Sequence, residues 1–253
     1  MKVLVIGGVA AGTKAAAKIK RQNRSAEVKI LTQSADISYA GCGLPYYVGG
    51  MIESREELIV NTPEKYTGLT GVEVVTRCEV TSVNFQAKTV TALCQGQTWL
   101  ESYDKLVIAT GATPFVPQVE GIRLPGVFTM RTPDDAIALR SYVQDRHCRS
   151  AVVVGAGFIG LEIAENLQAQ GLAVTVIDAA DQILPKIFDP EMAGYDRRRL
   201  RQNGIRVLTG TPLSEITGTE RADGVLANGT RIGADLVVLA IGIRPATTFL
   251  GGS

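Results

Sequence analysis

"SAVVVGAGFIGLEIAENLQAQG", residues 150–171, runs from β-branched residues through a glycine-rich turn into a helical pattern. Its three glycines, Gly155, Gly157 and Gly160, have the GxGxxG spacing. The first glycine permits a tight turn, the second lets backbone amides approach a pyrophosphate, and the third lets the helix pack on the strand. Because a helix N-terminus also carries partial positive charge, the stretch predicts a dinucleotide-binding turn.

The next strand, "LAVTVIDA", carries Asp178 at its end. A carboxylate there can accept both hydroxyls of an adenosine ribose and would repel a 2′-phosphate, so the pattern favours NADH over NADPH. The alternative is a glycine-rich turn that binds nothing. The cofactor contacts expected in this turn are Gly155, Gly157, Phe158, Ile159 and Gly160.

The same pattern occurs at the N-terminus, in "KVLVIGGVAAGTKAAAKIKRQ", residues 2–22. Val9 takes the place of the middle glycine, and the second strand ends at Thr32, where an acidic ribose partner would be expected. A dinucleotide is still the best interpretation, with Thr32 or Gln33 on its ribose. The cofactor contacts expected in this turn are Gly7, Gly8, Val9, Ala10, Ala11 and Gly12.

Each half closes with an apolar strand that runs into glycine, "YDKLVIATGATP" and "ADLVVLAIGIRP". Thr110, Gly111 and Gly242 in these closing strands are further candidate cofactor contacts. Apolar strands alternating with helices predict an α/β fold with two Rossmann-like, doubly wound parallel-sheet units. The expected domains are residues 1–115, with an antiparallel insertion at about 72–100, and residues 116–243.

The composition narrows the function classes. The 253 residues carry a net charge of +1, so nothing points to nucleic acid or to an anionic membrane as partner. No apolar run has the length of a membrane span. The four cysteines form neither a CxxC pair nor a metal-ligand spacing, which favours a reducing cytoplasm and no metal site.

One cysteine stands out, in "SYAGCGLPYY", residues 38–47. Cys42 lies between Gly41 and Gly43, which would let a cofactor or substrate reach its sulfur. Beside a helix N-terminus its thiolate would be stabilised as a nucleophile. The alternative is a small apolar packing residue.

Together, the two dinucleotide turns, "LAIGIRP" and "ISYAGCGLPYYVGG" resemble the flavin- and pyridine-nucleotide-dependent disulfide oxidoreductases. The cysteine segment is similar to the single-cysteine branch, closest to coenzyme A-disulfide reductases, NADH oxidases and persulfide reductases. The resemblance implies FAD on the first unit and NADH on the second. It also implies that Cys42 cycles between a thiolate and a mixed disulfide with CoA disulfide or a persulfide.

The resemblance further implies that residues 244–253 begin a return to the FAD domain and that the chain stops before the dimerisation domain of its homodimeric relatives. Glu162 would lie beside the nicotinamide and Phe158 over the flavin. Ala10 occupies the place of a histidine found in NADH peroxidases and many NADH oxidases, which favours thiol chemistry. The residues expected to bind the CoA substrate are Lys14, Lys18, Arg21, Ser38 and Gly41, the last in place of a common asparagine.

Two alternatives remain open. One is an NADH oxidase or a reductase of an electron-carrier protein, in which Cys42 is incidental. The other is a non-catalytic dinucleotide-binding fragment.

Overall fold

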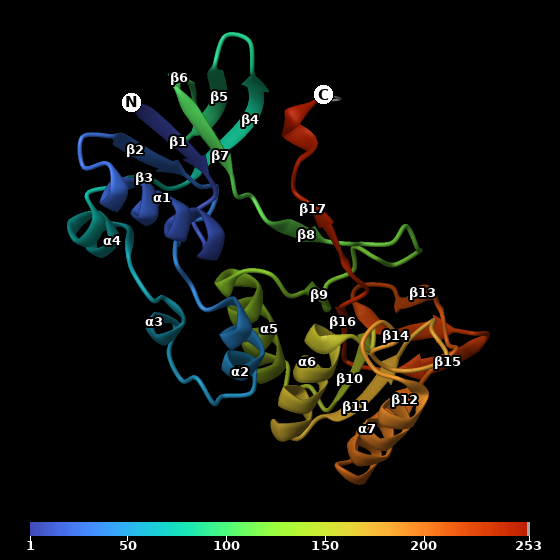
Figure 1. Cartoon of the computed structure of the whole chain (residues 1–253). Coiled ribbons are helices and arrows are strands. Elements are labelled where there is room, and N and C mark those ends of the chain that lie inside the picture. The colour runs from blue at the N-terminus through green and yellow to red at the C-terminus, as the bar shows by residue number, and fades with distance from the viewer. Residues whose placement is uncertain (252–253) are drawn as a thin grey trace. The chain divides into compact units, whose positions relative to one another are not determined.

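The computed structural model describes residues 1–251, which form two compact units (Figure 1). The first unit contains Met1–Ala40, Ile59–Thr113 and residues 245–251. The second contains Gly41–Leu58 and Pro114–Arg244. The units therefore differ from the boundaries expected from the sequence, because the segment that carries Cys42 groups with the second one.

A parallel sheet of order β3-β2-β1-β7 forms the centre of the first unit. Val3 and Val5 of β1 pack with Ala16 of helix α1, whereas Leu4 and Ile6 pack on the opposite face. Burial of both faces explains why these strands are almost continuously apolar. The elements are β1 (Lys2–Ile6), β2 (Glu27–Leu31), β3 (Glu73–Val75), β7 (Lys105–Ile108), α1 (Ala10–Gln22) and α4 (Pro63–Thr70).

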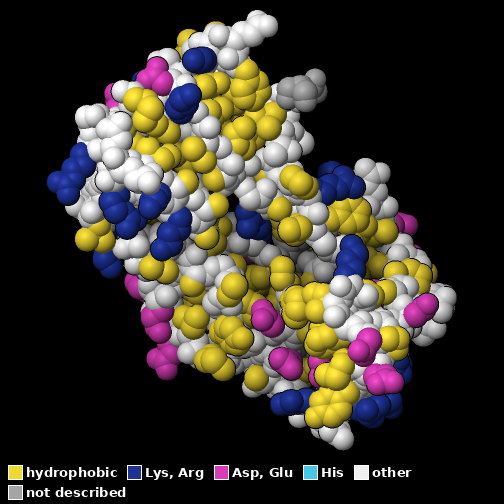
Figure 2. All heavy atoms as spheres, in the orientation of Figure 1, with side chains coloured by type: hydrophobic (Ala, Val, Ile, Leu, Met, Phe, Trp, Pro, Cys, Tyr) yellow, Lys and Arg dark blue, Asp and Glu magenta, His cyan; other side chains and the backbone are white. Residues whose placement is uncertain are grey.

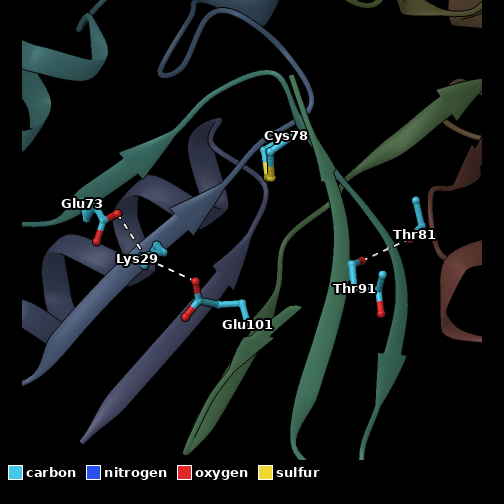
Figure 3. The surroundings of a disulfide bond; sticks show 7 residues. Lys29, Glu73, Cys78, Thr81, Thr91 and Glu101 are labelled. Carbon is cyan, nitrogen blue, oxygen red and sulfur yellow. Dashed lines mark hydrogen bonds and ion pairs between the residues drawn. A yellow bond between two sulfur atoms is a disulfide. The ribbon is translucent and has the colours of Figure 1, made fainter. Parts of the chain in front are cut away.

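An antiparallel sheet covers that opposite face, formed by β4 (Cys78–Asn84), β5 (Thr89–Cys94) and β6 (Gln97–Ser102). This is the insertion expected at about 72–100, but residues 73–75 belong to the parallel sheet as β3. Cys78 and Cys94 are opposite one another, buried, and joined by a disulfide (Figure 3). The sequence had suggested reduced cysteines instead.

The second unit repeats this plan. Its parallel sheet has the order β12-β11-β10-β16-β9, helix α6 packs on β10 and β11, and an antiparallel sheet β13-β14-β15 covers the other face. This second antiparallel sheet was not expected from the sequence. The elements are β9 (Val127–Thr129), β10 (Ser150–Val154), β11 (Ala173–Ile177), β12 (Arg206–Leu208), β13 (Leu213–Gly218), β14 (Ala222–Ala227), β15 (Thr230–Gly233), β16 (Leu236–Leu239), α5 (Pro133–Asp145), α6 (Phe158–Ala169) and α7 (Pro190–Gln202).

The remaining elements are short. The Cys42-bearing segment contains the 3₁₀ turn η1 (Gly41–Gly43) and the helices α2 (Leu44–Val48) and α3 (Arg55–Leu58). The strands β8 (Ala112–Pro114) and β17 (Ile243–Pro245) pair with each other, and the turn η2 (Thr248–Leu250) follows. Among residues 1–251, no helix is both long and apolar enough to cross a bilayer.

Large apolar side chains remain exposed on strands of the first unit, and Figure 2 shows hydrophobic side chains gathered on this part of the surface. Leu100 is 74% exposed, and Leu93, Trp99 and Ile108 are each between 38% and 44% exposed. Contiguous exposed apolar surface of this kind is typical of a face that another element covers.

Candidate functional site

Both glycine turns begin with a glycine whose backbone only glycine adopts readily. Gly7 has φ +109° and Gly155 has φ +110°. A Cβ at Gly7 would lie 2.2 Å from the carbonyl oxygen of Ala109, and one at Gly155 would lie 2.3 Å from that of Ala240. The closing strand of each unit therefore packs directly on the turn.

The third glycine of each turn is equally constrained. A Cβ at Gly12 would lie 1.8 Å from the Gly7 oxygen, and one at Gly160 would lie 1.9 Å from the Gly155 oxygen. The middle position differs between the units, because a Cβ at Gly157 would meet no described atom within 4 Å. The space at Gly157 is therefore open to a ligand, whereas Val9 fills the corresponding position of the first turn.

The helices that follow the two turns have uncapped N-termini. Within residues 1–251, neither α1 nor α6 has a side-chain hydrogen bond at its N-cap, whereas Thr62, Thr132 and Asp189 cap α4, α5 and α7. The first-turn residues Ala10, Ala11, Phe158 and Ile159 are exposed. Both starts therefore offer free backbone N–H groups to an anion, which fits the pyrophosphate of a dinucleotide.

The carboxylate of Asp178 is held at the second turn. Its Oδ2 accepts from the backbone N–H of Ala156 at 2.6 Å, and its Oδ1 accepts from that of Ala180 at 2.7 Å. A carboxylate can accept about four hydrogen bonds, so capacity remains for ribose hydroxyls. Its fixed negative charge beside the turn disfavours a 2′-phosphate.

The first unit has no equivalent carboxylate at the end of β2 among its described residues. Thr32 is only 6% exposed and packs on Gly8, with 3.1 Å from its Cβ to a Cβ built at Gly8. Gln33 is exposed, so of the two expected ribose partners it is the more accessible. The closing segments place Gly111 and Gly242 at positive φ, of +67° and +118°.

Cys42 lies in η1, directly before α2, and is exposed. It forms no disulfide with any residue of the described chain. A Cβ at Gly41 would meet no described atom within 4 Å, so an asparagine would also fit there. The glycine is therefore not required by packing, and it leaves one side of the thiol uncovered.

Cys148, the other unpaired cysteine of the described residues, has a different environment. Burial and, secondarily, the negative charge of Asp235 raise the pKa of its thiol, and its Sγ lies 3.7 Å from the carbonyl oxygen of Tyr142. A thiol held in its protonated form is a poor nucleophile. Cys148 is therefore a natural control for Cys42.

The residues expected to bind CoA lie mainly on α1, where Lys14, Lys18 and Arg21 are all exposed. Lys and Arg side chains gather over α1 and α4 in Figure 2. A pocket of about 510 Å³ lies there, and it includes Arg21. Its lining residues are Ala17, Lys20, Arg21, Arg24, Leu69 and Thr70.

Ser38 has φ +49°, and its N–H donates to the Gly8 carbonyl at 2.9 Å. The Nδ2 of Asn61 lies 3.4 Å from its Oγ. Ser38 and the first glycine turn therefore share one unit, whereas Gly41 belongs to the other.

In the second unit, Phe158 is 55% exposed at the start of α6 and Glu162 is half-buried one turn later. Residues 1–251 contain no group of three or more His, Cys, Asp or Glu side chains that could hold a metal ion. Sequence reasoning missed the residues that hold the Cys42-bearing segment, above all Arg140 of α5. No motif marks them, because their partners are distant in sequence.

The pyridine nucleotide-disulphide oxidoreductase family model matches residues 1–253, so the chain belongs to that family. Among curated relatives, an NADH oxidase of Methanocaldococcus jannaschii is 38% identical over 97% of this chain and 55% of its own. A CoA-dependent NAD(P)H sulfur oxidoreductase of Pyrococcus furiosus is 37% identical over 96% of this chain and 54% of its own.

Solved structures agree. Reduced Bacillus anthracis CoADR-RHD has a TM-score of 0.95 at 33% identity, covering 98% of this chain and 45% of that one. An NAD-dependent persulfide reductase from A. fulgidus has a TM-score of 0.95 at 37% identity, covering 98% and 47%. The chain thus spans about half the length of the relatives that it matches.

Proposed function

We propose that this chain is the dinucleotide-binding part of an NADH-dependent flavoprotein that reduces a small disulfide or persulfide through Cys42, with CoA disulfide as the best-supported substrate. The observation that carries this is the combination of two uncapped glycine-turn helices with an exposed, unpaired Cys42. Relatives named for sulfur, persulfide and CoA chemistry support the same class.

Each unit has its own task in this proposal. The turn at Gly155–Gly160 would hold NADH, with Asp178 on the ribose, and the turn at Gly7–Gly12 would hold FAD. When bound, FAD supplies a carrier that accepts hydride from the nicotinamide and donates two electrons to sulfur. The chain itself supplies the binding turns and the nucleophile.

At Cys42 the thiolate would attack one sulfur of CoA disulfide. The substrate S–S bond breaks, a Cys42–CoA disulfide forms, and the first CoA leaves as a thiolate that takes up a proton. Two electrons originating from NADH then cleave the mixed disulfide, which releases the second CoA thiol and restores the Cys42 thiolate. Arg21 and the basic pocket at α1 would bind the phosphates of CoA.

An NADH oxidase is the second candidate, because relatives that carry that name include the Methanocaldococcus jannaschii protein. Ala10 at the first turn argues against it, since the resemblance places a histidine there in many oxidases. A cytoplasmic location and a homodimer of the full-length protein are part of the main proposal.

The test assays NADH oxidation with CoA disulfide, CoA persulfide and oxygen in parallel, for the unmodified protein, Cys42→Ser and Cys148→Ser. We expect Cys42→Ser to abolish turnover of both sulfur substrates while leaving flavin reduction by NADH intact, and Cys148→Ser to change neither. Retained disulfide turnover in Cys42→Ser would refute the role of Cys42. Oxygen consumption that is unchanged by Cys42→Ser, without disulfide turnover, would identify the oxidase.

A further inference from the structure

The position of Cys42 depends on tertiary contacts of the segment Gly41–Leu58, here called the Cys42 segment. Its helix α2 has five residues and α3 has four, and helices this short are not stable alone. Packing against α5 and α6 of the second unit must therefore fix where Cys42 lies.

Arg140 of α5 contacts the Cys42 segment at Tyr47, Ile52 and Glu53. Its guanidinium carbon lies 4.6 Å from the ring centroid of Tyr47 in α2. Its Nη1 also lies 3.2 Å from the carbonyl oxygen of Ile52 and donates to that of Glu53 at 3.0 Å. One side chain thus ties the helix after Cys42 to the loop that follows it.

The geometry suits arginine and not lysine. A planar guanidinium can stack on an aromatic ring while its N–H groups donate to carbonyl oxygens at the edge. A lysine ammonium is a point charge that cannot satisfy both at once. A side chain that served only to neutralise a negative charge would need neither the stack on the ring nor the contacts with the two carbonyl oxygens.

Helix α6 provides a second anchor. The Nε2 of Gln170 donates to the Gly49 carbonyl at 2.5 Å, and a Cβ at Gly49 would lie 2.1 Å from Oδ1 of Asn166. Asn166 is 8% exposed and donates from its Nδ2 to the Glu162 carbonyl. The helix that begins at the second glycine turn therefore also holds the Cys42 segment.

We propose that Arg140 is a positioning residue for the thiol chemistry of Cys42, which it fixes by stacking on Tyr47 and by binding the Ile52 and Glu53 carbonyls. The proposal rests on the proposed function, because it assumes that Cys42 is the reacting group. Misplacing a reacting atom by about 1 Å can cost on the order of 100-fold in rate. Arg140→Lys would weaken the contact with the Tyr47 ring and displace Cys42 by less than about 1 Å, so a smaller loss of rate is expected.

The test compares Arg140→Lys, Tyr47→Leu and Tyr47→Phe, all in a Cys148→Ser background so that Cys42 is the reporting thiol. Arg146→Lys is the matched control, because Arg146 follows the same helix and stacks on Tyr142, at 5.9 Å. Two quantities are measured. One is hydrogen exchange of the Gly49, Met51 and Ile52 amides, and the other is the rate of mixed-disulfide formation with CoA disulfide and with Ellman's reagent across pH.

We expect Arg140→Lys and Tyr47→Leu to lose amide protection and to slow disulfide formation about tenfold. Tyr47→Phe keeps the ring, and it should behave like Arg146→Lys and the parent. If the variants lose amide protection but form the mixed disulfide at the parent's rate, Arg140 has only a structural role and the proposal is overturned. Unchanged amide protection in Arg140→Lys would also overturn it. If the parent reacts with Ellman's reagent but not with CoA disulfide, the proposed substrate fails, and the Ellman rates still decide the role of Arg140.

Discussion

At the scale of single residues, Asp178 shows how one carboxylate can serve both structure and selectivity. Its two hydrogen bonds to backbone amides hold it against the second glycine turn. Because those bonds fix its direction, its remaining acceptor sites would bind ribose hydroxyls at little ordering cost in the proposed function. Cys42 is the opposite case, since it is exposed and forms no disulfide with any described residue.

The first prediction concerns Asp178→Ala. NADH affinity should fall by about 10- to 100-fold, the equivalent of about 1.5–3 kcal/mol for hydrogen bonds to a charged group. NADPH affinity should fall less, because the repulsion of the 2′-phosphate is also removed. Fluorescence titration of both nucleotides measures the ratio, and equal losses would contradict the ribose role.

A matched variant adds Ala179→Arg to Asp178→Ala and should reverse the preference to NADPH. The added arginine would supply a positive charge and hydrogen-bond donors for the 2′-phosphate.

At the scale of elements, the glycines of the two turns differ in whether packing requires them. The first and third glycines are required by packing on the closing strand and on the turn itself. The middle position of the second turn, Gly157, has no such packing requirement among the described residues. A methyl group at Gly157 would therefore meet no described atom of the fold, and it would occupy the space that the proposed function assigns to the nucleotide.

The second prediction compares two alanine substitutions in one turn. Gly155→Ala forces a side chain into a positive-φ position 2.3 Å from the Ala240 oxygen and should lower the free energy of unfolding by about 1–3 kcal/mol. Gly157→Ala should leave the free energy of unfolding nearly unchanged and lower the affinity for NADH. Denaturant titration and nucleotide titration separate the two, and a stable Gly155→Ala would contradict the packing argument.

A charged network on the first sheet gives a third prediction. Glu101 of β6 forms an ion pair with Lys2, and its Oε2 lies 3.2 Å from Nζ of Lys29 (Figure 3). Lys29 also pairs with Glu73 at 3.2 Å. Lys29 and Glu101 side chains are only 13% and 15% exposed. Burial alone would raise the pKa of Glu101, but hydrogen bonds from Lys2 and Lys29 outweigh it and lower that pKa.

A carboxylate with a lowered pKa in the folded state stabilises above its unfolded pKa of about 4.3, and that stability is lost as the pH falls through the folded value. Glu101→Gln should therefore cost about 1–2 kcal/mol at pH 7. The cost should vanish as the pH falls below the lowered pKa that Glu101 has in the folded state. Urea titrations of both proteins across pH measure it, and a difference independent of pH would contradict the ionic explanation.

At the scale of the whole molecule, the chain repeats one architecture. Each unit has a parallel sheet, a helix on one face and a three-stranded antiparallel sheet on the other. Among residues 1–251, the buried cluster around β10, β14 and β16 contains no residue of the two buried clusters around β1. Separate cores permit the units to unfold separately.

The fourth prediction follows from this division. NADH at 100 times its Kd should stabilise the unit that binds it by about 2.7 kcal/mol. Hydrogen exchange should therefore slow in β10 and β11 and remain nearly unchanged in β1 and β2. Gly157→Ala should reduce the effect at the same NADH concentration, because it weakens NADH binding. Equal protection of both parallel sheets would contradict separate units.

Much of the fold was predictable because its signals are local. Apolar runs ending in spaced glycines mark both parallel sheets and both turns, and alternation in residues 72–93 predicts the antiparallel insertion. The sheet β13–β15 was missed, since its short strands contain Gly218 and Gly224 and alternate weakly. Val9, at the middle position of the first turn, shows that this position of the motif can vary, whereas packing requires glycine at the first and third positions.

The sequence by itself determined the two glycine turns, the place of Asp178 at the end of a strand and the place of Cys42 between two glycines, because each depends on residue type and short spacing. Only the tertiary structure decided that the Cys42 segment belongs to the second unit and that Arg140 and α6 hold it. Those contacts join residues about 90 to 120 positions apart, as the separations of 88, 87 and 121 show. No local pattern encodes such pairs, since they form only when separate elements pack.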